Sequence, residues 1–238
     1  MIRFEHVTKA YGQIRALHDV SVDIQDGEFV FLIGPSGAGK TTFLRLLIRD
    51  IAPSRGTICI DSWNLGTLPR SSVYLLRRKV GTVFQDFKLL SDRTVFENVA
   101  LGLEIRGKND SEIERDVMRV LTLVKLGEKR HLFPQQMSAG ELQRTSIART
   151  IVGGPSVILA DEPTGNLDPD TAWEILEILQ QVNSLGTTVI MATHNAGIVN
   201  DLKKRTIALD RGSMVSDEAK GRYHTTHKTA AARHKSEA

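Results

Sequence analysis

The sequence predicts an α/β fold built on a mainly parallel β-sheet. The first observation is the continuous apolar run Phe29–Ile33, which is typical of a strand buried on both faces. The second is a pair of similar runs, Val157–Ala160 and Thr187–Ala192, separated by a helical pattern over Pro169–Ser184. The third is the glycine-rich turn that starts at Gly34, directly after the first run. Strand, helix and strand in this order favour parallel βαβ units.

The remaining elements are expected around this sheet. Ile2–Val7 and Val20–Ile24 alternate apolar and polar residues, as half-buried strands do. Lys40–Asp50 has its apolar residues on one side, which predicts a helix, and Ser111–Leu126 shows a second helical period. We interpret the segment 97–137 as a mostly helical subdomain inserted into the sheet domain.

Composition and charge limit the function classes. The chain has 238 residues, of which 41% are hydrophobic, enough for one domain of 1–217 with a small subdomain. The segment 218–238 holds five of the 31 Lys/Arg and two of the 28 Asp/Glu, so the body has 26 of each. A formally neutral body argues against nucleic acid as a partner. The basic tail lacks an apolar period, which predicts disorder. Its charge fits a solubilising terminus, and contact with anionic lipid stays open as the alternative.

The chain is expected to reach a membrane only through a partner or at the surface. No apolar run approaches the roughly 20 residues of a spanning helix. The single cysteine, Cys59, falls in an apolar strand pattern and cannot form an intramolecular disulfide, which fits a reducing cytosol. The cysteine count therefore favours the cytosol as the compartment.

A phosphate-binding loop is the strongest motif of the sequence. The pattern G-x-x-x-x-G-K-[ST] is matched in full, between a predicted strand and a predicted helix, where it is required. Backbone N–H groups of such a loop surround phosphates, the lysine pairs with the β- and γ-phosphates, and the hydroxyl ligates Mg²⁺. The motif therefore predicts a nucleoside triphosphate with Mg²⁺, and the family resemblance given below implies that the nucleotide is ATP. The predicted residues are Gly34, Pro35, Ser36, Gly37, Ala38, Gly39, Lys40, Thr41 and Thr42.

A carboxylate pair, Asp161 and Glu162, follows the apolar run that starts at Val157. Ligands of open α/β sheets collect at the carboxyl ends of strands, so both side chains are expected to face the nucleotide. Asp161 is predicted to hold Mg²⁺. Glu162 is predicted to orient and polarise the attacking water, because phosphoryl transfer needs mainly positioning and charge stabilisation.

Together these motifs resemble the ABC ATPase family, from about Ile2 to Asp217. The family's signature motif is similar to the segment Met137-Ser138-Ala139-Gly140-Glu141. The resemblance implies a phosphate-loop ATPase of ABC type with an N-terminal antiparallel β subdomain. It also implies a head-to-tail dimer in which Ser138, Ala139, Gly140 and Glu141 bind the ATP held by the other copy. Ala139 departs from the family's glycine, and its methyl group is expected to slow hydrolysis.

Further positions match the family one by one. Gln85 resembles the glutamine that contacts Mg²⁺, and Asp168 belongs to a segment that resembles the loop crossing the dimer interface. His194 resembles the histidine that contacts the γ-phosphate, and Tyr11 resembles the aromatic residue that stacks on adenine. The resemblance thus makes Glu162, His194 and Lys40 the catalytic set, and Thr41, Gln85 and Asp161 the metal ligands.

The branch of the family follows from spacing and from one short segment. Gln85 and Ser138 are 53 positions apart without sustained heptads, whereas repair-type members carry a long coiled coil there. Translation-type members carry two such domains, and this chain has one phosphate loop. The segments 83–90, 93–95 and 97–99 resemble the cell-division ATPases of the family. This resemblance implies an integral membrane partner and a location at the cytoplasmic face of the cell membrane. The lipoprotein-releasing and macrolide-exporting branches stay open as alternatives.

The residues after Gln85 are predicted to contact that partner. Phe87, Leu89 and Leu90 place apolar groups in a segment that nucleotide binding does not require. The alternative is that they pack into the core of the helical subdomain.

Overall fold

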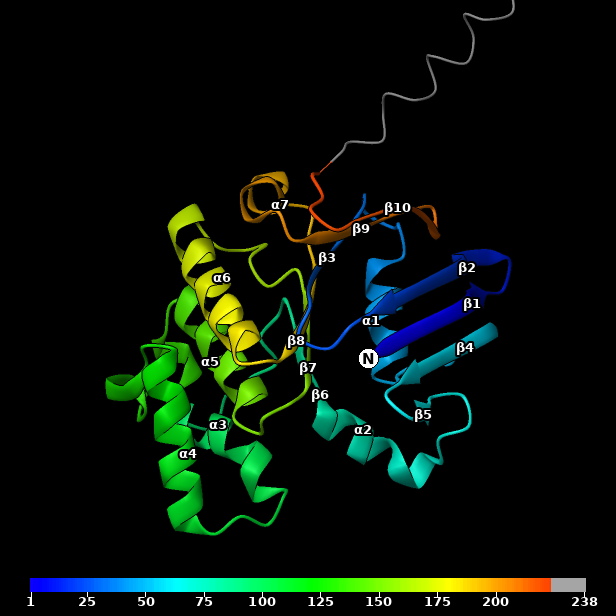
Figure 1. Cartoon of the computed structure of the whole chain (residues 1–238). Coiled ribbons are helices and arrows are strands. Elements are labelled where there is room, and N and C mark those ends of the chain that lie inside the picture. The colour runs from blue at the N-terminus through cyan, green and yellow to red at the C-terminus, as the bar shows by residue number, and fades with distance from the viewer. Residues whose placement is uncertain (224–238) are drawn as a thin grey trace, which may run out of the picture.

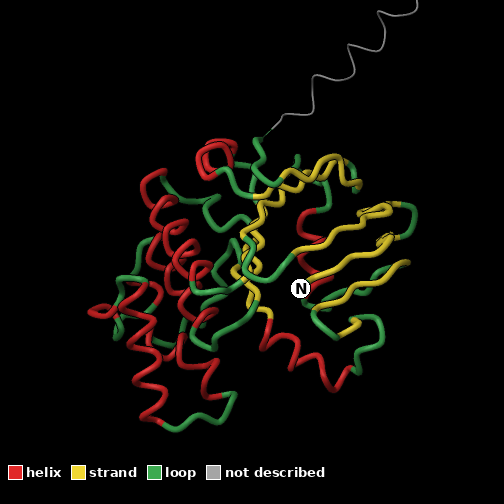
Figure 2. The backbone as a smooth tube through the Cα atoms, in the orientation of Figure 1, coloured by secondary structure: helices red, strands yellow, loops and turns green. Residues whose placement is uncertain are grey.

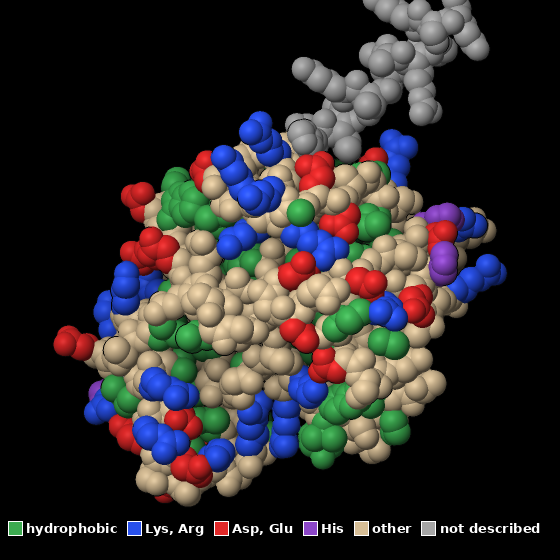
Figure 3. All heavy atoms as spheres, in the orientation of Figure 1, with side chains coloured by type: hydrophobic (Ala, Val, Ile, Leu, Met, Phe, Trp, Pro, Cys, Tyr) green, Lys and Arg blue, Asp and Glu red, His purple; other side chains and the backbone are tan. Residues whose placement is uncertain are grey.

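The structure, a computed structural model, describes residues 1–223 and arranges them as two sheets and a group of helices (Figure 1). Figure 2 shows the two sets of strands side by side, with most helices on the far side of the larger sheet. Among the described residues, no helix has both the length and the apolar composition needed to cross a bilayer. On the face drawn in Figure 3, Lys and Arg side chains are interspersed with Asp and Glu.

The larger sheet is parallel except at one edge. Five of its strands run parallel, and the sixth pairs antiparallel with its neighbour. Its strand order is β10 (Ser213–Glu218), β9 (Arg205–Asp210), β3 (Phe29–Ile33), β8 (Thr188–Ala192), β7 (Val157–Asp161) and β6 (Val80–Val83). The carboxyl ends of five strands therefore meet at one edge, where ligands of such sheets bind.

The smaller sheet is antiparallel and covers helix α1 (Lys40–Leu47). Its order is β2 (Ile14–Ile24), β1 (Ile2–Tyr11), β4 (Arg55–Ile60) and β5 (Trp63–Asn64). Alternating residues of these strands pack on α1, and Phe4 stacks on Phe43 with ring centroids 4.2 Å apart. Burial of two aromatic rings here fixes α1 between the two sheets.

Strand β3 shows why its sequence is apolar throughout. Val30 and Leu32 face α1 and the smaller sheet, whereas Phe29, Phe31 and Ile33 face the helices on the other side. All five side chains are buried, so no position of the strand can be polar without loss of stability. The phosphate loop that follows β3 thus starts from a rigid support.

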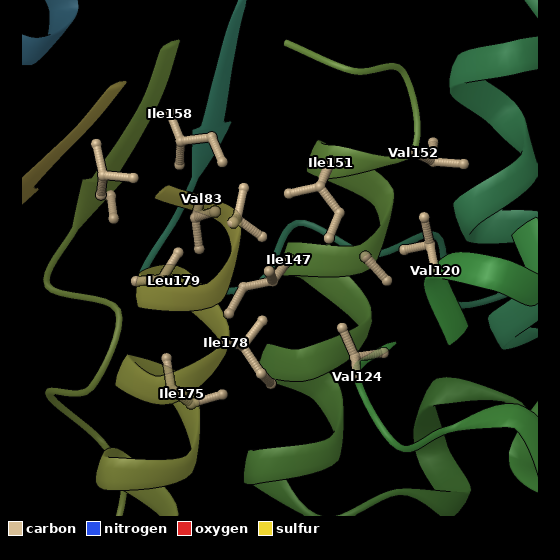
Figure 4. Packing of buried hydrophobic residues seen from close by; sticks show 14 of the residues in the cluster. Val83, Val120, Val124, Ile147, Ile151, Val152, Ile158, Ile175, Ile178 and Leu179 are labelled. Carbon is tan, nitrogen blue, oxygen red and sulfur yellow. The ribbon is translucent and has the colours of Figure 1, made fainter. Parts of the chain in front are cut away.

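The helices cover the second face of the larger sheet. They are α3 (Val95–Glu104), α4 (Asp110–Leu123), α5 (Ala139–Ile151), α6 (Pro169–Ser184) and α7 (Ala196–Leu202). Figure 4 shows Ile147 and Ile151 of α5 lying between Ile178 of α6 and Val120 of α4. Helix α2 (Val73–Lys79) and three short 3₁₀ turns, η1 (Arg70–Ser72), η2 (Gly127–Lys129) and η3 (Pro134–Gln136), lie in the connections.

The predicted fold class is confirmed, and several elements were not predicted. Strands β6, β9 and β10 were missed, because each is short or interrupted by polar residues. The helix predicted over Lys40–Asp50 ends earlier, at Leu47. The domain limits at 217 and the helical insertion at 97–137 stay predictions, and residues 224–238 of the predicted tail lie outside the described residues.

Candidate nucleotide site

The phosphate loop connects β3 to α1 at the carboxyl edge of the larger sheet. The backbone φ angles of Gly34, Gly37 and Gly39 are 148°, 78° and 107°. Residues other than glycine rarely adopt such angles, because their Cβ atom clashes with the backbone. A Cβ atom on Gly34 would lie 2.2 Å from the carbonyl oxygen of Leu209, and one on Gly39 would lie 2.4 Å from that of Ala16. Both glycines are therefore needed for the loop to close against the rest of the fold.

Two elements outside the motif hold the loop in place. Ala38 accepts a hydrogen bond from the N–H of Gly212, in the turn between β9 and β10, at 3.0 Å. The carbonyl of Gly212 in turn accepts from the N–H of His18 on β2, at 2.8 Å. The turn between β9 and β10, two strands that were not predicted from the sequence, thus supports the loop. Pro35, Ser36 and Gly37 remain exposed, and Thr42 is half-buried in the first turn of α1.

The side chain of Lys40, the first residue of α1, folds back over the start of the phosphate loop. Its ammonium group donates to the carbonyl oxygens of Gly34 at 2.7 Å and Pro35 at 3.3 Å, and its side chain is 10% exposed. The carboxylate of Glu162 lies 3.9 Å from the same nitrogen. A cation is therefore held at the mouth of the loop, where phosphate oxygens would replace the carbonyl contacts.

Asp161 and Glu162 lie at the carboxyl end of β7, facing α1. Burial raises the pKa of Asp161, and a hydrogen bond with the side chain of Thr41 partly offsets this effect. Glu162 is a non-glycine residue in the left-handed region, with φ of 50°, and its N–H donates to the carbonyl of Ala192 on β8 at 3.0 Å. Such backbone conformations persist where surrounding contacts fix them, and they cluster at functional sites.

His194 contacts Glu162 directly. The imidazole Nδ1 lies 2.9 Å from Oε2 of Glu162, and the N–H of His194 is 3.4 Å from the same oxygen. The other carboxylate oxygen faces Lys40, so Glu162 is oriented from two sides. This arrangement places one carboxylate between an imidazole and an ammonium group at the phosphate loop.

Gln85, Asp168 and Tyr11 lie around this centre. Gln85 is exposed just beyond β6, with its amide close to Gly165 in the turn after β7. Asp168 caps α6 by accepting from the N–H of Thr171 at 3.0 Å, and hydrogen bonds from Thr171 lower its pKa. Tyr11 is exposed at the end of β1, with the ammonium of Lys9 4.9 Å from its ring centroid.

The signature segment is on the surface at the start of α5. Ser138 is the N-cap, and its hydroxyl accepts from the N–H of Glu141 while the Glu141 carboxylate accepts from the Ser138 N–H at 2.9 Å. Ser138 and Ala139 are exposed, whereas a Cβ on the buried Gly140 would lie 2.4 Å from the Thr171 side chain. Within residues 1–223, no hydrogen bond or ion pair joins this segment to the phosphate loop.

The residues present fit a nucleotide with a hard cation. Among residues 1–223, no three His, Cys, Asp or Glu side chains gather as a metal cluster. Mg²⁺ in nucleotide sites is held by one or two carboxylates together with phosphate oxygens and water. Thr41 and Asp161, which contact each other beside Lys40, supply a ligand set of that kind.

Comparison with known proteins agrees with the assignment of a nucleotide site. Residues 17–165 match the ABC transporter family. The chain is 52% identical to the cell division ATP-binding protein FtsE of Bacillus subtilis, over 94% of this chain and 98% of that protein. The protein of the same name from Mycobacterium tuberculosis is 47% identical, over 94% and 98%. That of Escherichia coli is 45% identical, over 90% and 97%.

The chain belongs to the ABC transporter family, among its cell-division ATPases. Solved structures agree with this assignment. The ATP-binding cassette MJ0796 in a dimeric post-hydrolysis state, bound to ADP and Pi, superimposes with a TM-score of 0.85 at 33% identity, over 94% of this chain and all of that one. The cassette cbiO1 of Clostridium perfringens, part of an ABC transporter complex, gives 0.85 at 28%, over 92% and 88%. The predicted ATPase class and the resemblance to cell-division members are thereby confirmed.

The structure of this ABC ATPase also shows residues that the sequence analysis did not select. Arg149 of α5 and Asn98 of α3 hold the segment after Gln85 by hydrogen bonds to its backbone. The backbone of Ala16 and Gly212 supports the phosphate loop. Support of this kind could not be found from motifs, because backbone atoms carry no side-chain signal in a sequence.

Proposed function

We propose that two copies of this ATPase bind two ATP molecules head to tail. Each ATP would contact the phosphate loop of one copy and the Ser138–Glu141 segment of the other. The exposed position of Ser138 and Ala139, away from the phosphate loop of their own chain, supports this arrangement. A helix start also presents N–H groups without intrahelical partners, which suit phosphate oxygens. The dimeric state of the cassette MJ0796 supports it further.

The site residues would divide the reaction among them. Lys40 and the loop N–H groups would bind the β- and γ-phosphates, and Thr41, Asp161 and Gln85 would hold Mg²⁺, which neutralises charge on the phosphates. Glu162 would orient the attacking water and accept its proton, while His194 would fix that carboxylate and reach the γ-phosphate. Tyr11 would stack on the adenine, and Asp168 would lie at the dimer interface.

The dimer is proposed to drive an integral membrane protein of the FtsX type. The identity to cell-division relatives over nearly the whole chain carries this part of the proposal. The complex would sit at the cytoplasmic face of the membrane and regulate cell-wall hydrolases outside it. The segment after Gln85 would form the contact: Phe84 and Leu90 are exposed there, whereas Phe87 and Leu89 are half-buried. Leu90 is therefore a better candidate for the contact than Phe87.

Co-purification tests the partner contact. The chain is expressed with an FtsX-type membrane protein from the same organism, and the complex is isolated in detergent. We expect Leu90→Asp to lose the membrane protein while keeping its melting temperature and its affinity for ATP. Leu185→Asp is the matched control, because Leu185 is an exposed apolar residue at the carboxyl end of α6, outside the proposed sites. Equal recovery of the membrane protein with both variants would contradict the proposed surface.

A further inference from the structure

The segment between β6 and α3 is held by side chains from the helices behind it. Arg149, in the last turn of α5, donates from its two terminal nitrogens to the carbonyl oxygens of Lys88 at 2.6 Å and Phe87 at 2.8 Å. The buried Asn98 of α3 holds the other end of the segment. Its amide contacts the backbone of Leu90, Arg93 and Thr94 at 2.8–3.0 Å.

The backbone at the Arg149 contact is in an unusual conformation. Phe87 and Lys88 are consecutive non-glycine residues with φ angles of 59° and 51°. The left-handed region is unfavourable for such residues, so a pair of them persists only where other contacts fix the chain. The N–H groups of Phe87 and Lys88 donate to the carbonyls of Phe84 at 3.4 Å and Asp86 at 2.6 Å, which are local contacts. The two hydrogen bonds from Arg149 reach the carbonyls of the same two residues and hold them against α5.

The guanidinium group of Arg149 interacts with these backbone carbonyls and not with a carboxylate of the described residues. Burial lowers the pKa of its guanidinium, and within residues 1–223 no carboxylate lies within ion-pair distance of it. The neighbouring arginine of the same helix, Arg144, instead pairs with Glu174 of α6 at 2.8 Å. A half-buried charge without a carboxylate depends on the carbonyl dipoles around it. The carbonyls of the segment 87–88 supply them.

Helix α5 joins this contact to the signature segment. It begins at Ala139, just after Ser138, and Arg149 lies three turns further along the same continuous helix. An uninterrupted helix of this length spans about 16 Å between Ser138 and Arg149 and moves as one body. Displacement of the helix start therefore moves the guanidinium and the backbone that it holds.

We propose that Arg149 is a positioning residue that couples the signature helix to the segment 84–90. Closure of Ser138 and Ala139 on the ATP of a second copy would pull this segment through Arg149, while Asn98 keeps the part after Leu90 fixed to α3. The inference rests on the proposed dimer and on the proposed contact of this segment with a membrane protein. Beyond these two proposals, the inference names Arg149 as the residue that transmits movement from the dimer interface to the membrane-protein contact.

The first test needs neither nucleotide nor partner. Backbone hydrogen exchange of peptides covering 84–90 is compared between the parent chain and Arg149→Met, which keeps an unbranched apolar stem but removes the donors. Exchange is expected to be faster by about tenfold or more, the effect of losing a hydrogen bond to a charged donor. Arg149→Lys should lie between the two, and Arg144→Met, on the same helix, should exchange like the parent. Unchanged exchange in Arg149→Met, or equal acceleration in Arg144→Met, overturns the proposal.

The second test asks whether the segment responds to nucleotide. In the parent chain, MgATP is expected to change exchange both at the phosphate loop and over 84–90. In Arg149→Met the change at the phosphate loop should remain while the change over 84–90 is lost. A response over 84–90 that survives in Arg149→Met, or that is absent from a parent shown by size-exclusion chromatography to dimerise, rejects the coupling. Failure of the parent to dimerise would instead reject the proposed dimer, and the first test would still decide whether Arg149 fixes the segment.

Discussion

The phosphate loop and the signature segment are both predicted to bind ATP, but the fold completes only the first. The loop is closed by its own chain: the carbonyls of Ala16 and Leu209 lie against its glycines, and Lys40 and Glu162 face each other across it. The signature segment is exposed at Ser138, and its capping-box residue Glu141 pairs with Lys129 rather than with any residue of the phosphate loop. A folded monomer therefore contains the predicted cradle for phosphates and a separate exposed surface, which in the proposed dimer would face the ATP of a second copy. Substitutions in the two regions should consequently fail in different ways.

The largest effect is expected for Glu162→Gln. The amide cannot accept a proton from the attacking water, so turnover should fall by about 10² or more, the usual contribution of a general base. ATP affinity should persist because Lys40 and the loop are unchanged, and an ATP-bound dimer should accumulate. Phosphate release and size-exclusion chromatography with MgATP measure both effects.

Glu177→Gln serves as the control for that experiment, since Glu177 is an exposed acid on α6 outside the site. Turnover at the parental rate in Glu162→Gln would show that another group activates the water.

The next effect is expected for Lys40→Ala, which removes the cation at the mouth of the loop. A charge-assisted contact is worth roughly 1.5–3 kcal/mol, so affinity for a fluorescent ATP analogue should fall about tenfold or more. This loss should already appear in the monomer. Unchanged affinity would mean that the contacts of Lys40 with Gly34 and Pro35 are structural and that the loop N–H groups alone hold the nucleotide.

Ser138→Ala should act on the other region. It removes the N-cap of α5, which costs about 1 kcal/mol of stability, and it should abolish ATP-dependent dimerisation without changing ATP affinity of the monomer. Asn109→Ala is the matched control, because Asn109 forms a capping box of the same kind with Glu112 on α4. Denaturant unfolding should give similar losses for both variants. If both also dimerise equally, the signature segment does not bind the second ATP.

Asp161→Asn probes the metal position and the pH dependence. Burial raises the folded-state pKa of Asp161, so the unfolded chain loses this proton at lower pH than the folded chain does. Stability should therefore decrease as pH rises from the ordinary range of an aspartate to the raised value. The asparagine variant lacks this penalty and should melt about 2 °C higher at pH 7, with no difference at pH 3.

The same variant should lose the gain in ATP affinity that Mg²⁺ confers. Melting curves across pH and titrations with and without EDTA measure the two effects. A lower melting temperature for Asp161→Asn at pH 7 would show that the hydrogen bond with Thr41 outweighs the cost of burial.

The smallest effect is expected for Ala139→Gly. An extra methyl group in a closely packed contact costs roughly 1 kcal/mol at the low end, so its removal should strengthen ATP-dependent dimerisation by about fivefold if it obstructs the second copy. Sedimentation equilibrium with the Glu162→Gln background measures the change. Weaker dimerisation would mean that the loss of helix propensity at the start of α5 exceeds the steric gain.

The sequence alone determined the local parts of this protein. The phosphate loop could be predicted because its chemistry lies in eight consecutive residues, from Gly34 to Thr41, and the apolar run before it requires a strand buried on both faces. The capping pattern at Ser138 and the position of Asp161 at a strand end were predictable for the same reason. Short-range periodicity and motif spacing are read within one segment, and the physical rules that govern them are local.

Tertiary structure decided which distant residues meet. Strand β6 has only four residues and β9 is polar at both ends, so their places beside β7 and β3 follow from pairing rather than from their own patterns. The left-handed backbone of Glu162 and the contact of Arg149 with Phe87 and Lys88 are likewise invisible in the sequence. Such contacts join atoms more than 60 positions apart, many of them backbone atoms that every residue shares. Only the packed sheet and helices bring them within hydrogen-bond distance.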